Sequence, residues 1–104
     1  MATQARFSIG QVVHHLKFDY RGVIVDVDAE FQGSDEWYDQ VALSRPPKNK
    51  PWYHVLVDNA THMTYVAERH LESDADDRPI SHPALNQYFD ERYEGIYRMR
   101  RGFN

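Results

Sequence analysis

Short runs of β-branched and aromatic residues, each bounded by turn-forming residues, most constrain how this chain can fold. Residues 20–28 (YRGVIVDVD) alternate valines with Ile24 and two aspartates, a period-2 pattern typical of a strand with one buried and one mostly polar face. Residues 12–18, 52–57 and 63–66 are similar runs, separated by turn-compatible residues at 19–22 and 58–61. The pattern predicts a mainly β fold, a small barrel or curled sheet of four or five short strands.

Two segments depart from the strand pattern. Residues 29–50 form a long polar, proline-bearing insertion with room for one or two helical turns over 37–43, and loops of this length in a small domain are often functional. Residues 73–104 begin with the acidic run SDADD, after which Ser81 and Pro83 suit the start of a short C-terminal helix through Leu85 to about Tyr93. We therefore divide the chain into a barrel at 1–72 and an extension at 73–104 that packs on the barrel or on a partner.

Cysteine content and charge narrow the function classes. The 104 residues include no cysteine, which removes disulfides, thiolate zinc sites and cysteine nucleophiles together. The chain has neither an apolar leader nor an apolar run of roughly 20 residues, so we expect a cytoplasmic protein that does not enter a membrane. The formal net charge of −4 argues against tight, non-specific DNA binding, although a local basic patch stays open.

The residues form no catalytic or metal-binding pattern. His14 and His15 are adjacent, so on a strand they point to opposite faces, and the other four histidines lack zinc-ligand spacing. Asp26 and Asp28 share a strand face and could hold a divalent cation, but we favour a solvated strand end because no calcium-loop glycine follows. Phosphate-binding, dinucleotide-binding and serine-hydrolase motifs are absent from the sequence. We expect no enzymatic activity, cofactor or metal.

Binding of another macromolecule is the remaining class. Aromatic side chains can stack on bases or on an exposed peptide, and basic side chains can contact a polyanion, although each is more often core or solvated surface. The three C-terminal arginines are the best such cluster. The candidate contact residues are His14, His15, Lys17, Arg21, Trp52, Arg98, Arg100 and Arg101.

Three ordered segments resemble the heat-shock protein HspQ family, also described as hemimethylated-DNA-binding or YccV-like. The first is FSIGQVVHH at residues 7–15 and the second is YRGVIVDVD at 20–28. The third is PWYHVLV at 51–57, followed by TYVAE at 64–68 and Leu71. Each segment alone is weak, but their order and spacing cover most of residues 7–72 and make the resemblance specific.

The resemblance implies an SH3-like β-barrel, a non-enzymatic role and self-association of the chain, with a trimer as the expected form. It also implies two functions. One is to assist the degradation of denatured or selected proteins, including the replication initiator, during heat stress, with protein clients or a protease as partners. The alternative is to bind hemimethylated DNA. A small acidic barrel suits the first function. Sheet edges and apolar patches are general peptide-binding surfaces, and the acidic balance argues against DNA binding.

Overall fold

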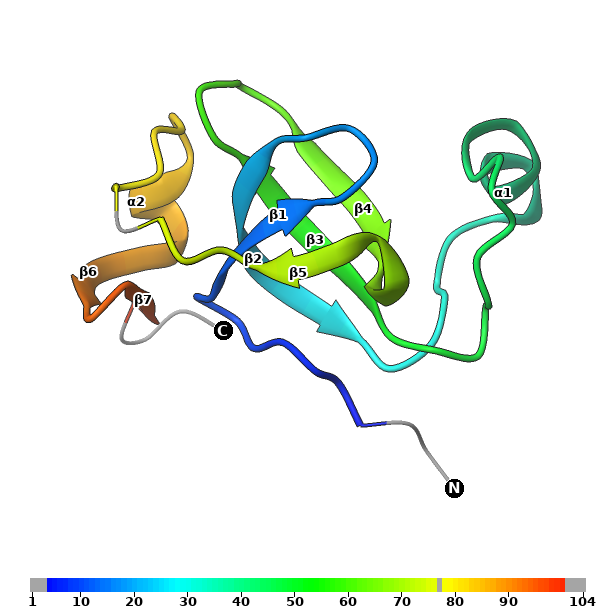
Figure 1. Cartoon of the computed structure of the whole chain (residues 1–104), viewed down its shortest axis with the longest axis horizontal. Helices are drawn as coiled ribbons and strands as arrows, with labels where there is room; N and C mark the ends of the chain where they lie inside the picture. Colours follow the sequence, from blue (N-terminus) through cyan, green and yellow to red (C-terminus); the bar gives the residue numbers. More distant parts are fainter. Residues whose placement is uncertain (1–3, 77, 101–104) are drawn as a thin grey trace.

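The fold is a strongly curled antiparallel sheet carrying a small hairpin and a helical insertion. The computed structural model describes residues 4–76 and 78–100. The five-stranded sheet has the order β4-β3-β2-β1-β5 (Figure 1). Its strands are β1 (Val12–His15), β2 (Arg21–Asp28), β3 (Trp52–Val57), β4 (Met63–Ala67) and β5 (Leu71–Ser73), and the 3-10 turn η1 (Glu68–His70) joins the last two. The predicted mainly β class is confirmed, and the finer SH3-like assignment stays a prediction.

The inner face of the curled sheet holds the first core. Each of the five strands contributes a side chain of at most 5% exposure, and Phe7 and Tyr53 close the cluster. The Tyr53 hydroxyl accepts a hydrogen bond from the Phe7 main chain and donates one to Glu68 at 2.6 Å. The members are Phe7, Val13, Ile24, Tyr53, Val55, Val66 and Leu71. Ile24 is thus buried in a core, although the predicted alternation placed it with Asp26 and Asp28 on the mostly polar face of β2.

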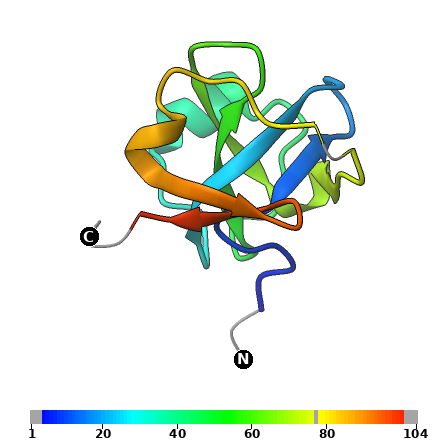
Figure 2. The ribbon, with the colours of Figure 1, turned by 90° about the vertical axis from the view of Figure 1, so that its left-hand side faces the viewer.

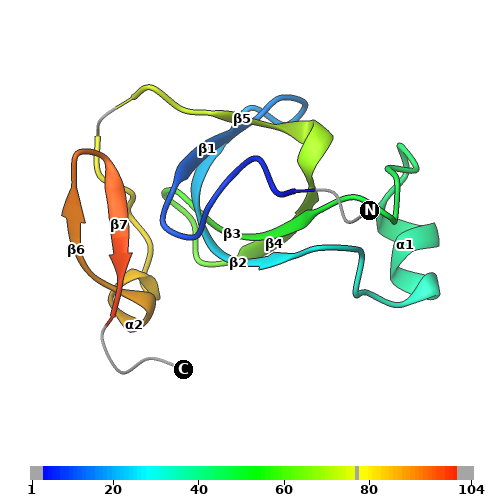
Figure 3. The same ribbon diagram turned by 90° about the horizontal axis from the view of Figure 1, so that it is seen from below.

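The opposite face of β2 carries Val23 and Val25 and is buried, as the alternation predicted. Val23 and Val25 are 0% and 5% exposed because the C-terminal segment covers them. They share a second core with Ile80, Phe89 and Tyr97 from that segment. Figure 2 shows the hairpin lying across this face, and Figure 3 shows it on the side opposite the helical insertion.

The predicted short C-terminal helix is present, but the prediction that it extends to about Tyr93 is wrong. α2 (Leu85–Tyr88) has one turn and leads into β6 (Phe89–Tyr93) and β7 (Ile96–Met99), which pair antiparallel. The turn between the strands has positive φ at both central residues, 50° at Glu94 and 79° at Gly95. This is the backbone of a two-residue hairpin turn, which glycine favours and which stops the helix from continuing.

Gly10 and Gly22 both permit close approach of two chain segments, by different means. Gly10 has φ of +91°, and its carbonyl oxygen accepts the Tyr97 N–H at 2.8 Å. A Cβ there would lie 2.0 Å from the Tyr97 carbonyl oxygen. Gly22 does not have a positive φ. Its side of β2 faces Leu56, whose carbonyl oxygen would lie 2.5 Å from a Cβ.

The insertion at 29–50 packs against the sheet rather than forming a loose loop. Helix α1 (Asp35–Val41) begins at Ser34, whose hydroxyl accepts the Trp37 N–H at 3.1 Å, so the predicted helical turns start two residues earlier than 37. Tyr38 and Ala42 are buried against Trp52 and Ala67 of the sheet. In residues 4–76 and 78–100, no helix is long and apolar enough to span a bilayer.

Candidate functional site

An apolar groove runs along the free edge of strand β4. We call it the β4 groove: its floor is β4, one wall is the end of α1 with Val41 and Leu43, and the other is the β1–β2 turn with Lys17 and Phe18. Its volume is about 370 Å³, within the size range of ligand-binding pockets. The exposed fractions are 68% for Phe18 and 75% for Leu43. Such exposure of large apolar side chains around one concave site is typical of interaction surfaces.

The β1–β2 turn presents Phe18 to the groove because His15 holds the turn from inside. The His15 Nδ1 accepts the main-chain N–H groups of Lys17 and Phe18 at 3.1 and 3.0 Å, and Asp19 adopts φ of 55°. The ring itself is 5% exposed and stacks on Tyr20 and His70 at 5.0 and 5.6 Å between centroids. His15 is thus a support of the groove wall rather than a surface contact.

Burial and neighbouring positive charge keep the His15 ring neutral. Burial lowers its pKa from 6.5 to about 4, with further lowering by His70, His14 and Lys17. As the pH falls from 6.5 to 4 the unfolded chain takes up this proton before the folded chain does, so the free energy of unfolding decreases over that window. The neutral ring is also the form whose Nδ1 can accept both turn N–H groups.

We predict that His15→Asn reduces the acid sensitivity of folding. The asparagine oxygen can accept the same N–H groups but does not titrate, so the unfolding free energy of the variant changes less than that of the wild type between neutral pH and about pH 5. Urea unfolding at the two pH values measures this difference. The pKa of His14 is raised, so this residue changes the free energy of unfolding with pH in the opposite direction, and it does so in both proteins. Equal slopes for the two proteins would contradict the assigned role of His15.

His14 points to the face opposite His15, as predicted. Its Nε2 lies 2.6 Å from Asp19 and its Nδ1 lies 2.9 Å from Glu72. Hydrogen bonds to these two carboxylates raise the pKa of His14. The positive charge it can carry is therefore balanced within the chain, which weakens its attraction for a phosphate.

Arg21, another predicted contact residue, has a structural setting. Its guanidinium is 12% exposed and lies 3.1 Å from Asp58 and 3.1 Å from Asp74. It also donates to the main-chain oxygens of Asp76 and Arg78 at 3.2 and 2.8 Å. These bonds tie β2 to the start of the C-terminal segment and occupy the group that would contact a partner.

Of the remaining predicted contact residues, Trp52 lines the groove with Lys17 but is buried, and the described arginines Arg98 and Arg100 lie outside its lining. Trp52 is 2% exposed beneath the insertion, and its Nε1 donates to the Pro47 carbonyl. Arg98 pairs with Glu91 at 2.7 Å, and the Nε of Arg100 donates to the Asn86 carbonyl. Arg101 lies outside the described residues. The assignment of these residues as contacts stays a prediction.

Lys17 lines the groove and has no carboxylate partner among the described residues, unlike several other surface cations. Among the described residues that line the groove there is no Asp or Glu. The Lys17 Nζ lies 5.6 Å from the Phe18 ring. Arg69 lies next to the groove, lines the neighbouring cavity and donates to the main-chain oxygen of Ser44 at 2.6 Å. In contrast, Arg45, Lys48 and Arg78 each pair with an aspartate. The groove is thus an apolar site with a positive local charge in an acidic protein. The sequence singled out Lys17 but missed Leu43 and Phe18. Phe18 was counted with the strand-like run 12–18, but β1 ends at His15 and Phe18 lies in the turn.

A group with metal-ligand chemistry lies at the other end of β2. A register shift between Ile24 and Asp26 places Asp26 opposite His54, and oxygens of Asp26 and Asp28 lie within 4.8 Å of the His54 ring nitrogen and of each other. The His54 Nε2 lies 3.1 Å from Asp28, whose carboxylate also accepts the Tyr65 hydroxyl at 2.6 Å. These hydrogen bonds account for the arrangement, which is a partly buried network rather than the expected solvated strand end.

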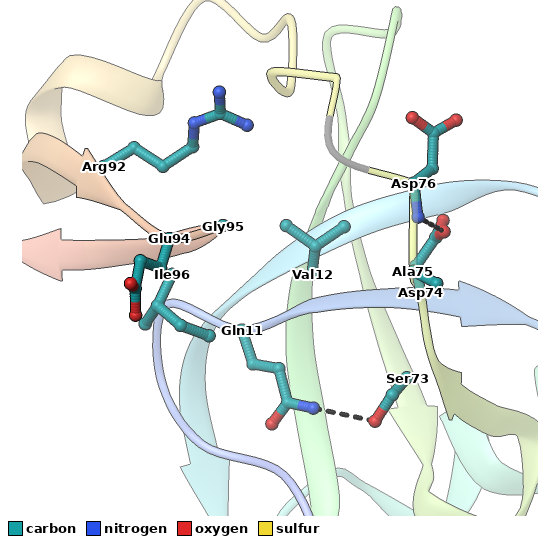
Figure 4. A pocket seen from close by; sticks show the side chains of 10 residues that line it. All are labelled: Gln11, Val12, Ser73, Asp74, Ala75, Asp76, Arg92, Glu94, Gly95 and Ile96. Carbon is teal, nitrogen blue, oxygen red and sulfur yellow. Dashed lines mark hydrogen bonds between the residues drawn. The ribbon is translucent and has the colours of Figure 1, made fainter.

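A second cavity, of about 510 Å³, lies at the seam between the sheet and the hairpin turn (Figure 4). Asp74 and Asp76 line one side and Arg92 and Glu94 the other. Asp74 is already paired with Arg21, and hydrogen bonds from Arg78 lower the pKa of Asp76. Its charges of both signs give it no single ligand preference, so the β4 groove is the stronger candidate site.

The chain matches a known protein-family model. The model described as "Hemimethylated DNA-binding protein YccV like" matches residues 5–95. The match includes all five strands of the sheet, the helical insertion and the segment through β6 to Gly95. It therefore extends beyond the resemblance over 7–72 and takes in most of the C-terminal segment.

Proposed function

The chain belongs to the YccV-like family of hemimethylated DNA-binding proteins, and on that premise we propose that it is a non-enzymatic binding protein that holds exposed apolar segments of denatured or selected proteins and so assists their degradation. The single observation that carries the proposal is the β4 groove. It offers exposed aliphatic and aromatic side chains beside a free sheet edge, the two features that bind unfolded polypeptide without specific sequence.

The degradation role draws on the resemblance to heat-shock proteins, and the geometry supports its binding step. An unfolded client exposes apolar side chains that a folded protein buries. A small acidic protein with an apolar groove can hold such a segment. Its net charge of −4 at the same time repels strongly anionic partners.

DNA binding is the second candidate, and the family description favours it. Two features of the structure weigh against the contacts expected for it. Arg21 and Arg98 are engaged by carboxylates, and His14 lies between two more. Reading a methyl group in the major groove requires an apolar contact flanked by basic side chains that are free to reach base edges and phosphates.

We predict that Leu43→Asp weakens binding of a permanently unfolded protein by tenfold or more. Leu43 is 75% exposed at the groove, and burial of a leucine side chain by a partner contributes about 1.5–3 kcal/mol, of which roughly 1.4 kcal/mol is one factor of ten. Fluorescence anisotropy of a labelled, reduced and alkylated client measures the affinity, and the turnover of that client by a purified protease measures the consequence.

Ile96→Asp is the matched control, because Ile96 is 48% exposed on the hairpin, outside the lining of the groove. It introduces the same charge and should leave client affinity within about twofold, since exposed substitutions away from a site have small effects. Equal affinities of Leu43→Asp and the wild type would refute the groove as the client site.

A further inference from the structure

We propose that the β4 groove takes its occupant as an added β-strand: an extended segment of another polypeptide pairs with the main chain of β4 and places a carboxylate beside Lys17. The inference rests on the proposed function and specifies how the segment is held. It follows from the orientation of the β4 main chain, the apolar walls and the unbalanced positive charge.

The register of β3 and β4 shows which β4 groups face the open edge. The Val57 N–H donates to the His62 carbonyl at 3.3 Å, and the Glu68 N–H donates to the Pro51 carbonyl at 3.1 Å. Antiparallel pairs alternate between hydrogen-bonded and non-hydrogen-bonded, so the pairs between these two ends alternate as well. The main-chain N–H and C=O groups of Met63, Tyr65 and Ala67 therefore point away from β3.

These groups form a template for strand addition. β4 is a terminal strand of the sheet order β4-β3-β2-β1-β5, and an edge strand offers its outward groups to another extended chain. All five of its residues line the groove. A segment laid along β4 would alternate its side chains between the two sides of the sheet. Phe18 and Leu43 give it apolar contacts within the groove.

Charge complementarity sets the chemistry of the occupant. Lys17 and Arg69 both lie close enough to His70 to contribute to its lowered pKa, after the larger effect of burial. Lys17 lines the groove, where no described lining residue is a carboxylate, whereas Arg69 lines the neighbouring cavity together with Glu68. An apolar segment that carries one Asp or Glu would supply the missing negative charge, and its carboxylate would form charge-assisted hydrogen bonds with Lys17.

A DNA duplex fits this site less well than a peptide. The groove is concave and its described lining is mostly apolar, with Lys17 as its basic contact besides the histidines of lowered pKa, His15 and His70. Duplex recognition instead depends on several phosphate contacts spread along a surface. The main-chain edge of β4 has no counterpart on a duplex.

The test compares Met63→Pro with Met63→Ala. Both remove the Met63 side chain, but only proline removes the outward N–H, and neither removes a hydrogen bond to β3 because that N–H does not take part in the β3–β4 ladder. Binding is measured by anisotropy with a labelled eight-residue peptide of alternating valines and one glutamate. We expect Met63→Pro to bind about tenfold more weakly than Met63→Ala, the value of one good main-chain hydrogen bond.

Two altered peptides complete the test. N-methylation of alternate residues can be placed in either of two sets, and only one of the two sets should abolish binding of the peptide. The Glu→Gln peptide should bind the wild type more weakly than the glutamate peptide does. The two peptides should bind Lys17→Met equally well. Equal affinities of Met63→Pro and Met63→Ala, with both still folded by circular dichroism, would overturn strand addition while the wild type still bound unfolded client. Failure of the wild type to bind either the peptide or the client would instead overturn the proposed function, and preference of the groove for a DNA duplex would assign it to that partner.

Discussion

Replacing Arg21 with methionine is expected to lower the free energy of unfolding by about 3–5 kcal/mol, the usual cost of breaking a buried ion pair from one side. The guanidinium is 12% exposed, and the carboxylates of Asp58 and Asp74 that it contacts are 8% and 14% exposed. Removing it leaves two buried negative charges without their cation and two main-chain oxygens without a donor. Methionine keeps most of the side-chain volume, so the change tests the polar network rather than packing.

Urea unfolding followed by tryptophan fluorescence measures this loss, with Arg98→Met as the control. Arg98 also pairs with a carboxylate, but the two side chains are 73% and 56% exposed, and such surface pairs contribute about 0–1 kcal/mol. A loss for Arg21→Met as small as that for Arg98→Met would contradict the structural role given to Arg21 and return it to the candidate contact residues.

Replacing Phe89 with alanine is expected to cost about 3–5 kcal/mol, as is typical of a buried aromatic side chain. Phe89 is 2% exposed, packs with Val25 and Leu56 of the sheet, and lies 5.5 Å from the Tyr97 ring. Because this core joins the hairpin to the sheet, the whole described chain should unfold in one transition, at a lower urea concentration than the wild type.

Tyr93→Ala is the control for Phe89, since Tyr93 lies on the same strand and is 73% exposed. Its effect should stay within about 0.5 kcal/mol. A separate early transition of the hairpin, with the sheet unchanged by Phe89→Ala, would contradict the shared core and support a division of the chain at residue 72.

The strands were predictable because their alternation is local. Residues 20–28 predicted β2 and the burial of its valines, and Val23 and Val25 are buried. The burial of Ile24 was not predictable from the same pattern, because it depends on Phe7 and Leu71, which the curl of the sheet brings to that face from distant parts of the chain. The C-terminal helix was predicted too long because Leu85, Tyr88 and Phe89 have helical spacing. The turn at Glu94 and Gly95 instead selects a hairpin.

The candidate site was predictable only in part, because exposure depends on distant partners. The sequence identifies Arg21 as a basic residue beside a turn, but its partners Asp58 and Asp74 lie 37 and 53 positions away. Lys17 does lie at the groove, but composition alone could not distinguish this lysine from the cations that pair with carboxylates. The groove itself forms only when α1 and the β1–β2 turn meet at the β4 edge, a juxtaposition that no local pattern encodes.

One measurement tests the central claim most directly: anisotropy of wild type and Leu43→Asp with a labelled unfolded client and with a labelled hemimethylated duplex, at physiological salt. The account predicts that the wild type binds the client, that Leu43→Asp loses this binding, and that the duplex binds weakly and releases as salt rises. Tight binding of the hemimethylated duplex over the unmethylated one, with client binding absent or unchanged by Leu43→Asp, would contradict it and make DNA the partner of this chain.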